Sequence, residues 1–184
     1  MKTANTIIQG FEPCDSAVDW LGRKGVRSAW NTCDRADWML WALERLVIDR
    51  KTLVRIACDI AEPTLKFLPA GEDRPRIAIA TARSWCDGVA TPEDVANAAA
   101  NAYAAYLNYA TYDAYAANSA ANSAAGAAFT AFTVTYATYV VNAAANSATY
   151  AGHTPAKRQC ADIVRKYVSA EDVEALIEKE NNHA

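Results

Sequence analysis

The chain has 184 residues, a hydrophobic fraction of 52% and a formal net charge of −3. Its length suits a single domain with enough material for a core, although much of the hydrophobic fraction is alanine. The weak acidic balance excludes a basic field that would attract nucleic acid, and it is too small for a mimic of DNA. We therefore expect no nucleic-acid partner. The N-terminal stretch lacks the apolar run of a signal peptide, so we expect a cytoplasmic protein.

Helix signals follow one another closely through the first half of the chain. We expect helices over residues 16–22, 26–33, 35–46, 50–68 and 74–88. Asp49 suits the N-cap of the fourth helix, and Pro63 should kink or split that helix. Pro75 suits the first turn of the fifth helix.

The segment between Val95 and Gly152 is rich in alanine, and Asp113 is its only Asp, Glu, Lys or Arg. Such a segment has high helix propensity but no charged face, so it must pack against itself, the rest of the chain or another copy. Residues 124–145 contain no Leu or Ile, which favours a buried helix of a soluble protein over a membrane span. We therefore expect no membrane association, and a homodimer would be one way to cover the uncharged faces.

A clear start signal precedes the alanine-rich segment. Thr91, Pro92 and Asp94 have the pattern of an acidic capping box with proline in the first turn. The segment is too long for one helix, and Asn118–Gly126 is the expected break because Asn, Ser and Gly are poor helix formers. The prediction is a long antiparallel hairpin of two helices over residues 91–152.

Four aromatic residues in the second half of this hairpin follow a helical spacing. They are Phe129, Phe132, Tyr136 and Tyr139. Spacings of three, four and three residues place them on one face of a helix, and we expect that face to point into the core.

The C-terminal part of the chain contains two further start signals. Thr154 and Pro155 open one helix, and Ser169 with Asp172 caps the last one. The expected fold is therefore a single all-α domain over residues 1–184. Its three parts are a front half of short helices over 12–90, the alanine-rich hairpin over 91–152, and C-terminal helices over 154–182.

Five cysteines are scattered along the chain at Cys14, Cys33, Cys58, Cys86 and Cys160. Their number is odd, no CxxC pair occurs, and only His153 and His183 could join them as soft ligands. Neither a disulfide framework nor a zinc site is expected. We interpret the five cysteines as small apolar core residues of a protein in a reducing compartment.

Charged residues interleave with tryptophan and cysteine in the front half. The candidate ligand- or partner-binding residues are Asp34, Arg35, Asp37, Trp38, Asp59, Glu72, Asp73, Arg74 and Arg76. In the structural interpretation, which we favour, Arg35 or Arg74 makes bidentate pairs with Asp34, Asp37 or Asp59. In the functional interpretation, the same groups line a pocket for an anion, a metal or a side chain of a partner.

The sequence contains no complete catalytic constellation. Ser28, Thr32 and Ser84 have no nearby histidine that could activate them as nucleophiles. The acidic residues follow no DxD or ExxE spacing, and the AGEDR loop has too few glycines to cradle a phosphate. We therefore predict no enzyme activity, no catalytic residues, no metal site and no cofactor.

Several strings of the chain resemble a family of proposed immunity proteins from bacteria and their phages. They are CDRADWMLWALERL, ACD, PAGEDRPRIAIATARSW and RQCADIVRKY, with an alanine- and tyrosine-rich middle between the last two. The resemblance extends from Phe11 to Tyr167, and DWMLW and GEDRPR are its most specific strings. It implies a helical, cytoplasmic protein that neutralises a toxin or effector by binding. If the gene is carried by a phage, the target would instead be a bacterial defence system. The family has no established binding residues to carry over to this chain.

Three functions follow from these patterns, in order of preference. The first is a non-catalytic binding protein that neutralises a protein toxin or a defence effector. The second is a small-molecule binder that sequesters a nucleotide-like signal, because Tyr, Trp and Arg stack on bases and hold phosphates. The third is a metal-dependent hydrolase built on the acidic residues.

Overall fold

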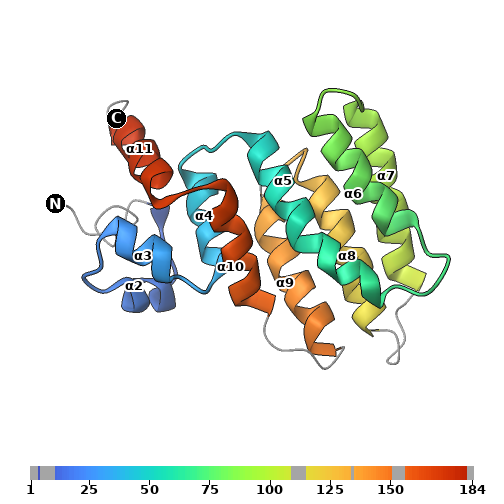
Figure 1. Cartoon of the computed structure of the whole chain (residues 1–184), viewed down its shortest axis with the longest axis horizontal. Coiled ribbons are helices and arrows are strands. Elements are labelled where there is room, and N and C mark those ends of the chain that lie inside the picture. Colours follow the sequence, from blue (N-terminus) through green and yellow to red (C-terminus); the bar gives the residue numbers. More distant parts are fainter. Residues whose placement is uncertain (1–3, 5–10, 109–114, 134, 151–155, 182–184) are drawn as a thin grey trace.

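The computed structural model describes residues 4, 11–108, 115–133, 135–150 and 156–181. Helices make up all of the regular structure in these ranges, with no strand among them, which confirms the all-α prediction (Figure 1). None of the described helices combines the length and apolar character needed to cross a membrane. Several residues singled out in the sequence lie outside these ranges: Asp113, His153, Thr154, Pro155 and His183.

The order of the helices follows the front-half predictions closely. In chain order they are α2 (Asp15–Leu21), α3 (Val26–Thr32), α4 (Ala36–Arg45), α5 (Arg50–Ala61), the 3-10 helix η2 (Glu62–Phe67), α6 (Arg74–Cys86), α7 (Pro92–Asn108), α8 (Tyr115–Phe129), α9 (Thr135–Tyr150), α10 (Ala156–Tyr167) and α11 (Ala170–Asn181). Pro63 lies in η2, directly after α5 ends, so the predicted split at this proline is confirmed. Pro75 occupies the first turn of α6, as its fixed φ angle favours.

Side chains cap three of the helices where the sequence predicted caps. Asp49 Oδ2 accepts a hydrogen bond of 3.0 Å from the backbone N–H three residues later. Thr91 and Asp94 bond reciprocally, with N–H to side-chain oxygen distances of 2.8 and 3.2 Å. Ser169 and Asp172 repeat this capping box at 2.8 and 3.1 Å. Each cap satisfies backbone donors that the helix leaves open, and a cap typically contributes about 1 kcal/mol.

The predicted helix break at Asn118–Gly126 is wrong, because α8 runs through this stretch without interruption. The small residues there allow close packing instead of ending the helix. Ser123 Oγ donates to the carbonyl oxygen of Val140 at 3.5 Å, and a Cβ atom on Gly126 would lie 3.0 Å from Val140 Cγ2. Tertiary packing therefore outweighs the poor helix propensity of Asn, Ser and Gly. The alanine-rich segment forms three described helices, α7, α8 and α9, in place of a hairpin of two.

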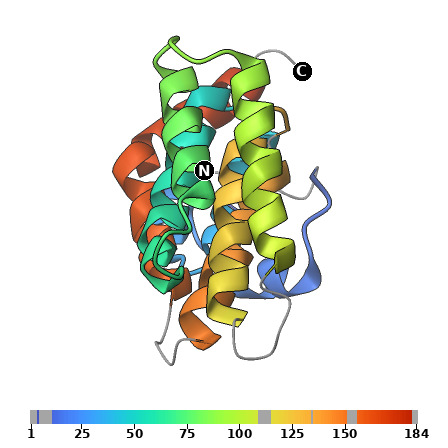
Figure 2. The same cartoon turned by 90° about the vertical axis from the view of Figure 1, so that its right-hand side faces the viewer.

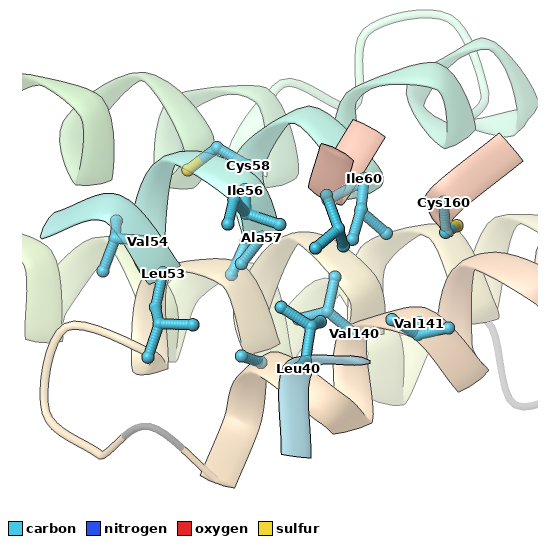
Figure 3. Close-up of a cluster of buried hydrophobic side chains, with 14 of the residues drawn as sticks. Leu40, Leu53, Val54, Ile56, Ala57, Cys58, Ile60, Val140, Val141 and Cys160 are labelled. Atoms are coloured by element: carbon cyan, nitrogen blue, oxygen red, sulfur yellow. The ribbon is translucent and has the colours of Figure 1, made fainter. Parts of the chain in front are cut away.

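Helix α8 lies at the centre of the fold. It packs between α7 and α9, and α5, α6 and η2 also contact it (Figures 1 and 2). Seven of its eight alanines are almost completely buried: Ala117, Ala120, Ala121, Ala124, Ala125, Ala127 and Ala128. Larger side chains fill the neighbouring space between α4, α5 and α9, including Leu40, Leu53, Ile56 and Val140 (Figure 3). The core therefore combines a thin alanine layer with bulky side chains from the front half.

The predicted aromatic stripe is also wrong. Phe129 ends α8, Phe132 lies in the turn, and Tyr136 and Tyr139 belong to α9, so helical spacing does not apply across them. Phe132, Tyr136 and Tyr139 are 40%, 37% and 44% exposed, which places them at the surface. Tyr136 contacts the rings of Phe129 and Tyr139, with centroids 5.2 and 6.2 Å away, and Tyr139 Oη accepts a hydrogen bond of 2.6 Å from Asn122 Nδ2.

The burial of α8 within the chain changes the argument for self-association. The uncharged alanine face is covered by α5, α6, α7 and α9, so it needs no second copy. A homodimer stays a prediction, and it would have to use another surface. Light scattering at high concentration measures the oligomeric state directly.

Candidate functional site

A pocket of about 430 Å³ lies where α2, α3 and α4 meet α9 and α11. Five aromatic side chains contribute to its lining: Phe11, Trp20, Trp30, Trp38 and Trp41. Val173 and Ile177 of α11 and Thr138 and Asn142 of α9 complete other parts of the wall. Sites for small molecules commonly have volumes of about 300–1,000 Å³ and walls that are mainly apolar, with a few polar groups.

The local sequence explains why this end of the fold leaves space. Helices α2 and α3 contain only 7 residues each, so each spans roughly two turns. Gly22 adopts a φ of +47° at the end of α2, and this conformation permits the sharp turn that leads to α3. Ala17 and Ala29 present only methyl groups towards the pocket, so the tryptophan rings define its walls.

The aromatic walls are held in place by contacts among the rings and by the protein's own cations. Trp20 and Trp38 lie with ring centroids 5.9 Å apart. Lys24 Nζ lies 4.4 Å from the Trp20 centroid, and Arg35 Cζ lies 4.3 Å from the Trp38 centroid. Phe11 contacts Trp41 in an edge-on arrangement, with ring centroids 6.5 Å apart. These contacts preorganise the pocket, which lowers the entropic cost of binding.

Among the described residues that line the pocket, two carry a charged side chain, Glu12 and Asp37, and both are acidic. Asp37 accepts two hydrogen bonds from Arg35, one from Nε at 2.9 Å and one from Nη2 at 2.6 Å. Burial alone would raise the pKa of Asp37, but the hydrogen bonds and charge of Arg35 outweigh it and hold that pKa below its usual range. The carboxylate of Asp37 therefore stays ionised at neutral pH.

The structure distributes the sequence-predicted site residues over α4, α5 and α6 and the segments that precede α4 and α6. Arg35, Asp37 and Trp38 lie at the start of α4, and the latter two line the pocket. Asp34 is exposed beside them. The remaining candidates lie on α5 or around the start of α6: Asp59, Glu72, Asp73, Arg74 and Arg76.

The structural interpretation of the charged residues is confirmed for one predicted pair. Arg35 binds Asp37 in the bidentate arrangement that planar guanidinium groups favour. Arg74 differs from the prediction, because it pairs with Glu72 through Nε at 2.8 Å and also through Nη2. This second pair fastens the loop before α6 to the first turn of that helix.

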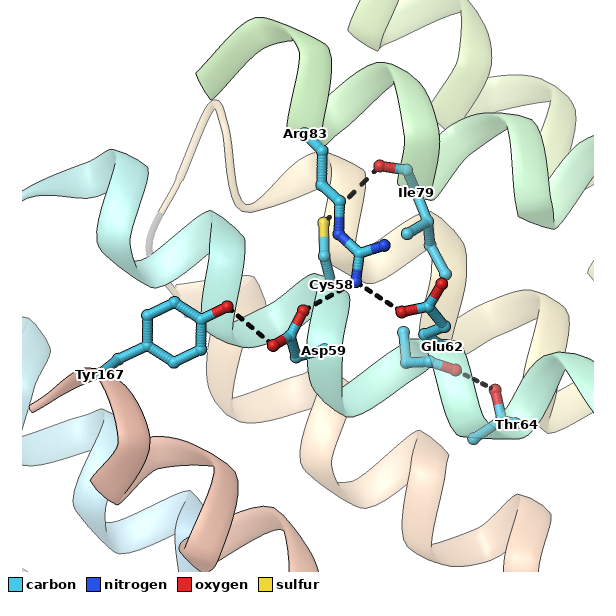
Figure 4. Close-up of polar contacts among 8 residues, drawn as sticks. Cys58, Asp59, Glu62, Thr64, Ile79, Arg83 and Tyr167 are labelled. Atoms are coloured by element: carbon cyan, nitrogen blue, oxygen red, sulfur yellow. Dashed lines mark hydrogen bonds and ion pairs between the residues drawn. The ribbon is translucent and has the colours of Figure 1, made fainter. Parts of the chain in front are cut away.

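Asp59 belongs to a polar network that joins three helices (Figure 4). Arg83 Nη2 lies 2.7 Å from Asp59 Oδ1 and 2.7 Å from Glu62 Oε2. Tyr167 Oη of α10 donates to Asp59 Oδ2 at 2.7 Å. The network connects α5, α6 and α10, so Asp59 has a structural role that its sequence context did not distinguish from a binding role.

The Tyr167 hydroxyl gives this network a measurable pH dependence. Burial and then the hydrogen bond to Asp59 raise the pKa of Tyr167 to about 12, whereas tyrosine in the unfolded chain ionises near pH 10. Its contribution to stability is therefore complete below about pH 10 and is lost as the pH rises through about 12. We expect urea midpoints at pH 9, 10 and 11 to fall more steeply for wild type than for Tyr167→Phe.

The matched control for this prediction is Tyr103→Phe, which removes the hydroxyl of a ring exposed on α7. It should follow the wild-type pH profile. Equal slopes for wild type and Tyr167→Phe would show that the Asp59 hydrogen bond does not hold the Tyr167 proton.

The pocket contains residues that sequence reasoning missed. The sequence patterns do not single out Trp20, Trp30, Trp41 or Phe11 as site residues. A signal was nevertheless present, because four of the five tryptophans fall within residues 20–41. This concentration of large rings in a short stretch could have directed attention to this end of the chain.

The cysteines divide into two environments, which corrects the prediction that all are core residues. Cys33, Cys58, Cys86 and Cys160 are buried, and burial raises the pKa of each thiol, to about 12 for Cys58 and Cys160. Cys14 is exposed and lines the pocket. The contact with Ser16 Oγ and a backbone hydrogen bond with Ala17 hold the pKa of Cys14 below its ordinary value.

These environments predict that one thiol of five reacts rapidly with Ellman's reagent in the native protein. Cys14 is accessible and has the lowered pKa, whereas the four buried thiols should react only after unfolding. In denaturant all five should react. Cys14→Ser should remove the rapid phase; a rapid phase that persists in this variant would contradict the assignment.

Within the residues that the structure describes, no three His, Cys, Asp or Glu side chains are grouped so as to hold a metal ion. No protein-family model matches the chain, and neither curated proteins nor solved structures contain a match to it. The pocket is therefore interpreted from its own geometry.

Proposed function

We propose that this protein is a non-catalytic binding protein that holds a small molecule with an apolar or aromatic body in the tryptophan-lined pocket. The observation that supports this proposal is the pocket of about 430 Å³ with four tryptophans in its lining. Aromatic rings provide large contact areas with few rotatable bonds, so they bind flat or apolar ligands at low entropic cost.

The polar groups of the pocket are better suited to orienting a bound ligand than to catalysing a reaction of that ligand. Asp37 is engaged by two hydrogen bonds from Arg35, which keeps it charged and fixed. Thr138 and Asn142 add neutral hydrogen-bonding groups on the α9 side. A few fixed polar groups in an apolar wall are typical of sites that select and hold a ligand.

A nucleotide-like ligand, the alternative from the sequence, agrees with the rings but not with the charges. Bases stack well on tryptophan. The charged groups in the described lining, Glu12 and Asp37, are acidic, and Arg35 balances the charge of Asp37, so this lining offers no positive group to bind a phosphate. The pocket geometry therefore favours a ligand without a phosphate.

Neutralisation of a protein toxin or defence effector is the second candidate function. It is supported by the exposed aromatic edge formed by Phe132, Tyr136 and Tyr139. Aromatic residues are enriched at protein interfaces, and this edge belongs to a stretch of the chain with almost no charge. The immunity-family resemblance points in the same direction.

Native mass spectrometry of the protein, purified gently from its host, tests both candidates. Under the first proposal, wild type carries a small molecule of a few hundred daltons. Ala42→Phe places a ring into the pocket from α4 and should lose that mass. The matched control Ala104→Phe adds the same ring on the exposed side of α7 and should keep it.

The possible outcomes separate the candidates. Retention of the small molecule by Ala42→Phe would contradict the pocket proposal. A stoichiometric polypeptide in place of a small molecule, lost in Tyr136→Ser and kept in Ala42→Phe, would support the second candidate.

A further inference from the structure

We infer that the ligand of the tryptophan-lined pocket is an organic cation with a flat apolar body. This inference rests on the proposed small-molecule function and specifies its ligand class. It combines two features of the described lining: the faces of the tryptophan rings and the sign of the charges beside them.

The rings supply the first part of the argument. The face of an indole ring is the negative end of its quadrupole, so it attracts ammonium and guanidinium groups. The protein shows this attraction at three rings of the wall, the most distant being Arg45, whose Cζ lies 5.8 Å from the Trp41 centroid. Lys24 lies over Trp20 at 4.4 Å and Arg35 lies over Trp38 at 4.3 Å from the ring centroids. The local field therefore accommodates positive charge beside apolar surface.

The carboxylates supply the second part. Asp37 has only 14% of its side chain exposed, and its negative charge is partly balanced by Arg35. Glu12 adds a second negative charge at an exposed position of the lining. A cationic ligand gains from the ring faces and from Glu12, and it gains less from Asp37 because Arg35 balances part of that charge. An anionic ligand gains from none of these groups. A neutral ligand gains only the apolar contacts.

Isothermal titration calorimetry with three naphthalene probes tests this inference on the intact protein. The probes share one ring system and carry a trimethylammonium, a hydroxymethyl or a sulfonate group. We expect the ammonium probe to bind more tightly than the hydroxymethyl probe by at least about fivefold, and the sulfonate probe to bind most weakly. In each case Ala42→Phe should abolish the binding and Ala104→Phe should not.

Charge-neutralising variants assign the preference to the pocket. Glu12→Gln should weaken the ammonium probe several-fold and leave the hydroxymethyl probe unchanged. Asp19→Asn is the matched control, because Asp19 is exposed on α2 beside Trp20 and lies outside the lining. It should change neither affinity. A thermal unfolding curve for each variant confirms that the protein is folded.

The failures of the two proposals are distinguishable. If the hydroxymethyl or sulfonate probe binds as tightly as the ammonium probe and Ala42→Phe blocks it, the pocket function stands and the cation inference is wrong. If no probe binds and the protein carries no small molecule from its host, the pocket function itself is contradicted.

Discussion

Replacing Ala124 with glutamate is expected to lower the free energy of unfolding by about 3–5 kcal/mol, or to prevent folding altogether. Ala124 is 0% exposed and lies in α8, which α5, α6, α7 and α9 surround. The new carboxylate would have to be buried without a partner or be protonated at a raised pKa. Either result costs a large part of the roughly 5–15 kcal/mol that stabilises a typical domain.

The control for this prediction is Ala104→Glu, the same substitution on the exposed side of α7. It should change the free energy of unfolding by no more than about 0.5 kcal/mol. Urea unfolding followed by circular dichroism measures both variants. Similar midpoints for Ala124→Glu and Ala104→Glu would contradict the central position of α8.

The contrast between these two alanines shows what local sequence signals can and cannot predict here. Capping boxes at Thr91 and Ser169 were predictable because a cap involves residues within one turn. The continuity of α8 was not, because Asn, Ser and Gly lower helix propensity locally but allow close approach of α9. The energy of that approach depends on residues about 17 positions away, such as Val140.

The pocket was unpredictable for a related reason. Its rings come from the N-terminal segment, α2, α3 and α4, and α11 closes part of the wall with Val173. Sequence reasoning found Asp37 and Trp38 because a charged residue beside a tryptophan is a local pattern. It could not find a volume, since a pocket depends on how short helices pack at one end of the fold. The charged candidates at α6, such as Arg74, instead form local ion pairs.

Trp30 is the residue at which the fold and the pocket depend on each other most directly. Its side chain is 6% exposed, and Nε1 donates to the carbonyl oxygen of Val168 at 3.0 Å. The carbonyl oxygen of Trp30 itself accepts from Arg165 Nε at 3.1 Å. These contacts join α3 to the junction between α10 and α11. Two surface ion pairs from Arg27 to Glu171 and Glu174 add little, because all three side chains are largely or partly exposed.

Trp30→Ala should therefore lower the free energy of unfolding by about 3–5 kcal/mol, the usual cost of removing a large buried aromatic side chain. Trp30→Phe keeps most of the apolar contacts but leaves the Val168 carbonyl oxygen without its donor. We expect it to cost about 1–3 kcal/mol. Urea unfolding of both variants gives the two values. A cost for Trp30→Phe within the range of surface substitutions would show that the hydrogen bond contributes nothing.

Hydrogen exchange distinguishes local from global effects of these changes. If Trp30 holds α11 against α3, exchange at the α11 amides should accelerate more in Trp30→Phe than exchange at the α8 amides, because α11 can open without unfolding the core. The pocket would lose Val173 and Ile177 from its wall in the same opening. The ammonium probe should then bind Trp30→Phe more weakly than wild type even where the variant is fully folded, both because α11 opens and because Trp30 itself lines the pocket. Uniform acceleration across α8 and α11 would instead show that α11 unfolds only together with the core.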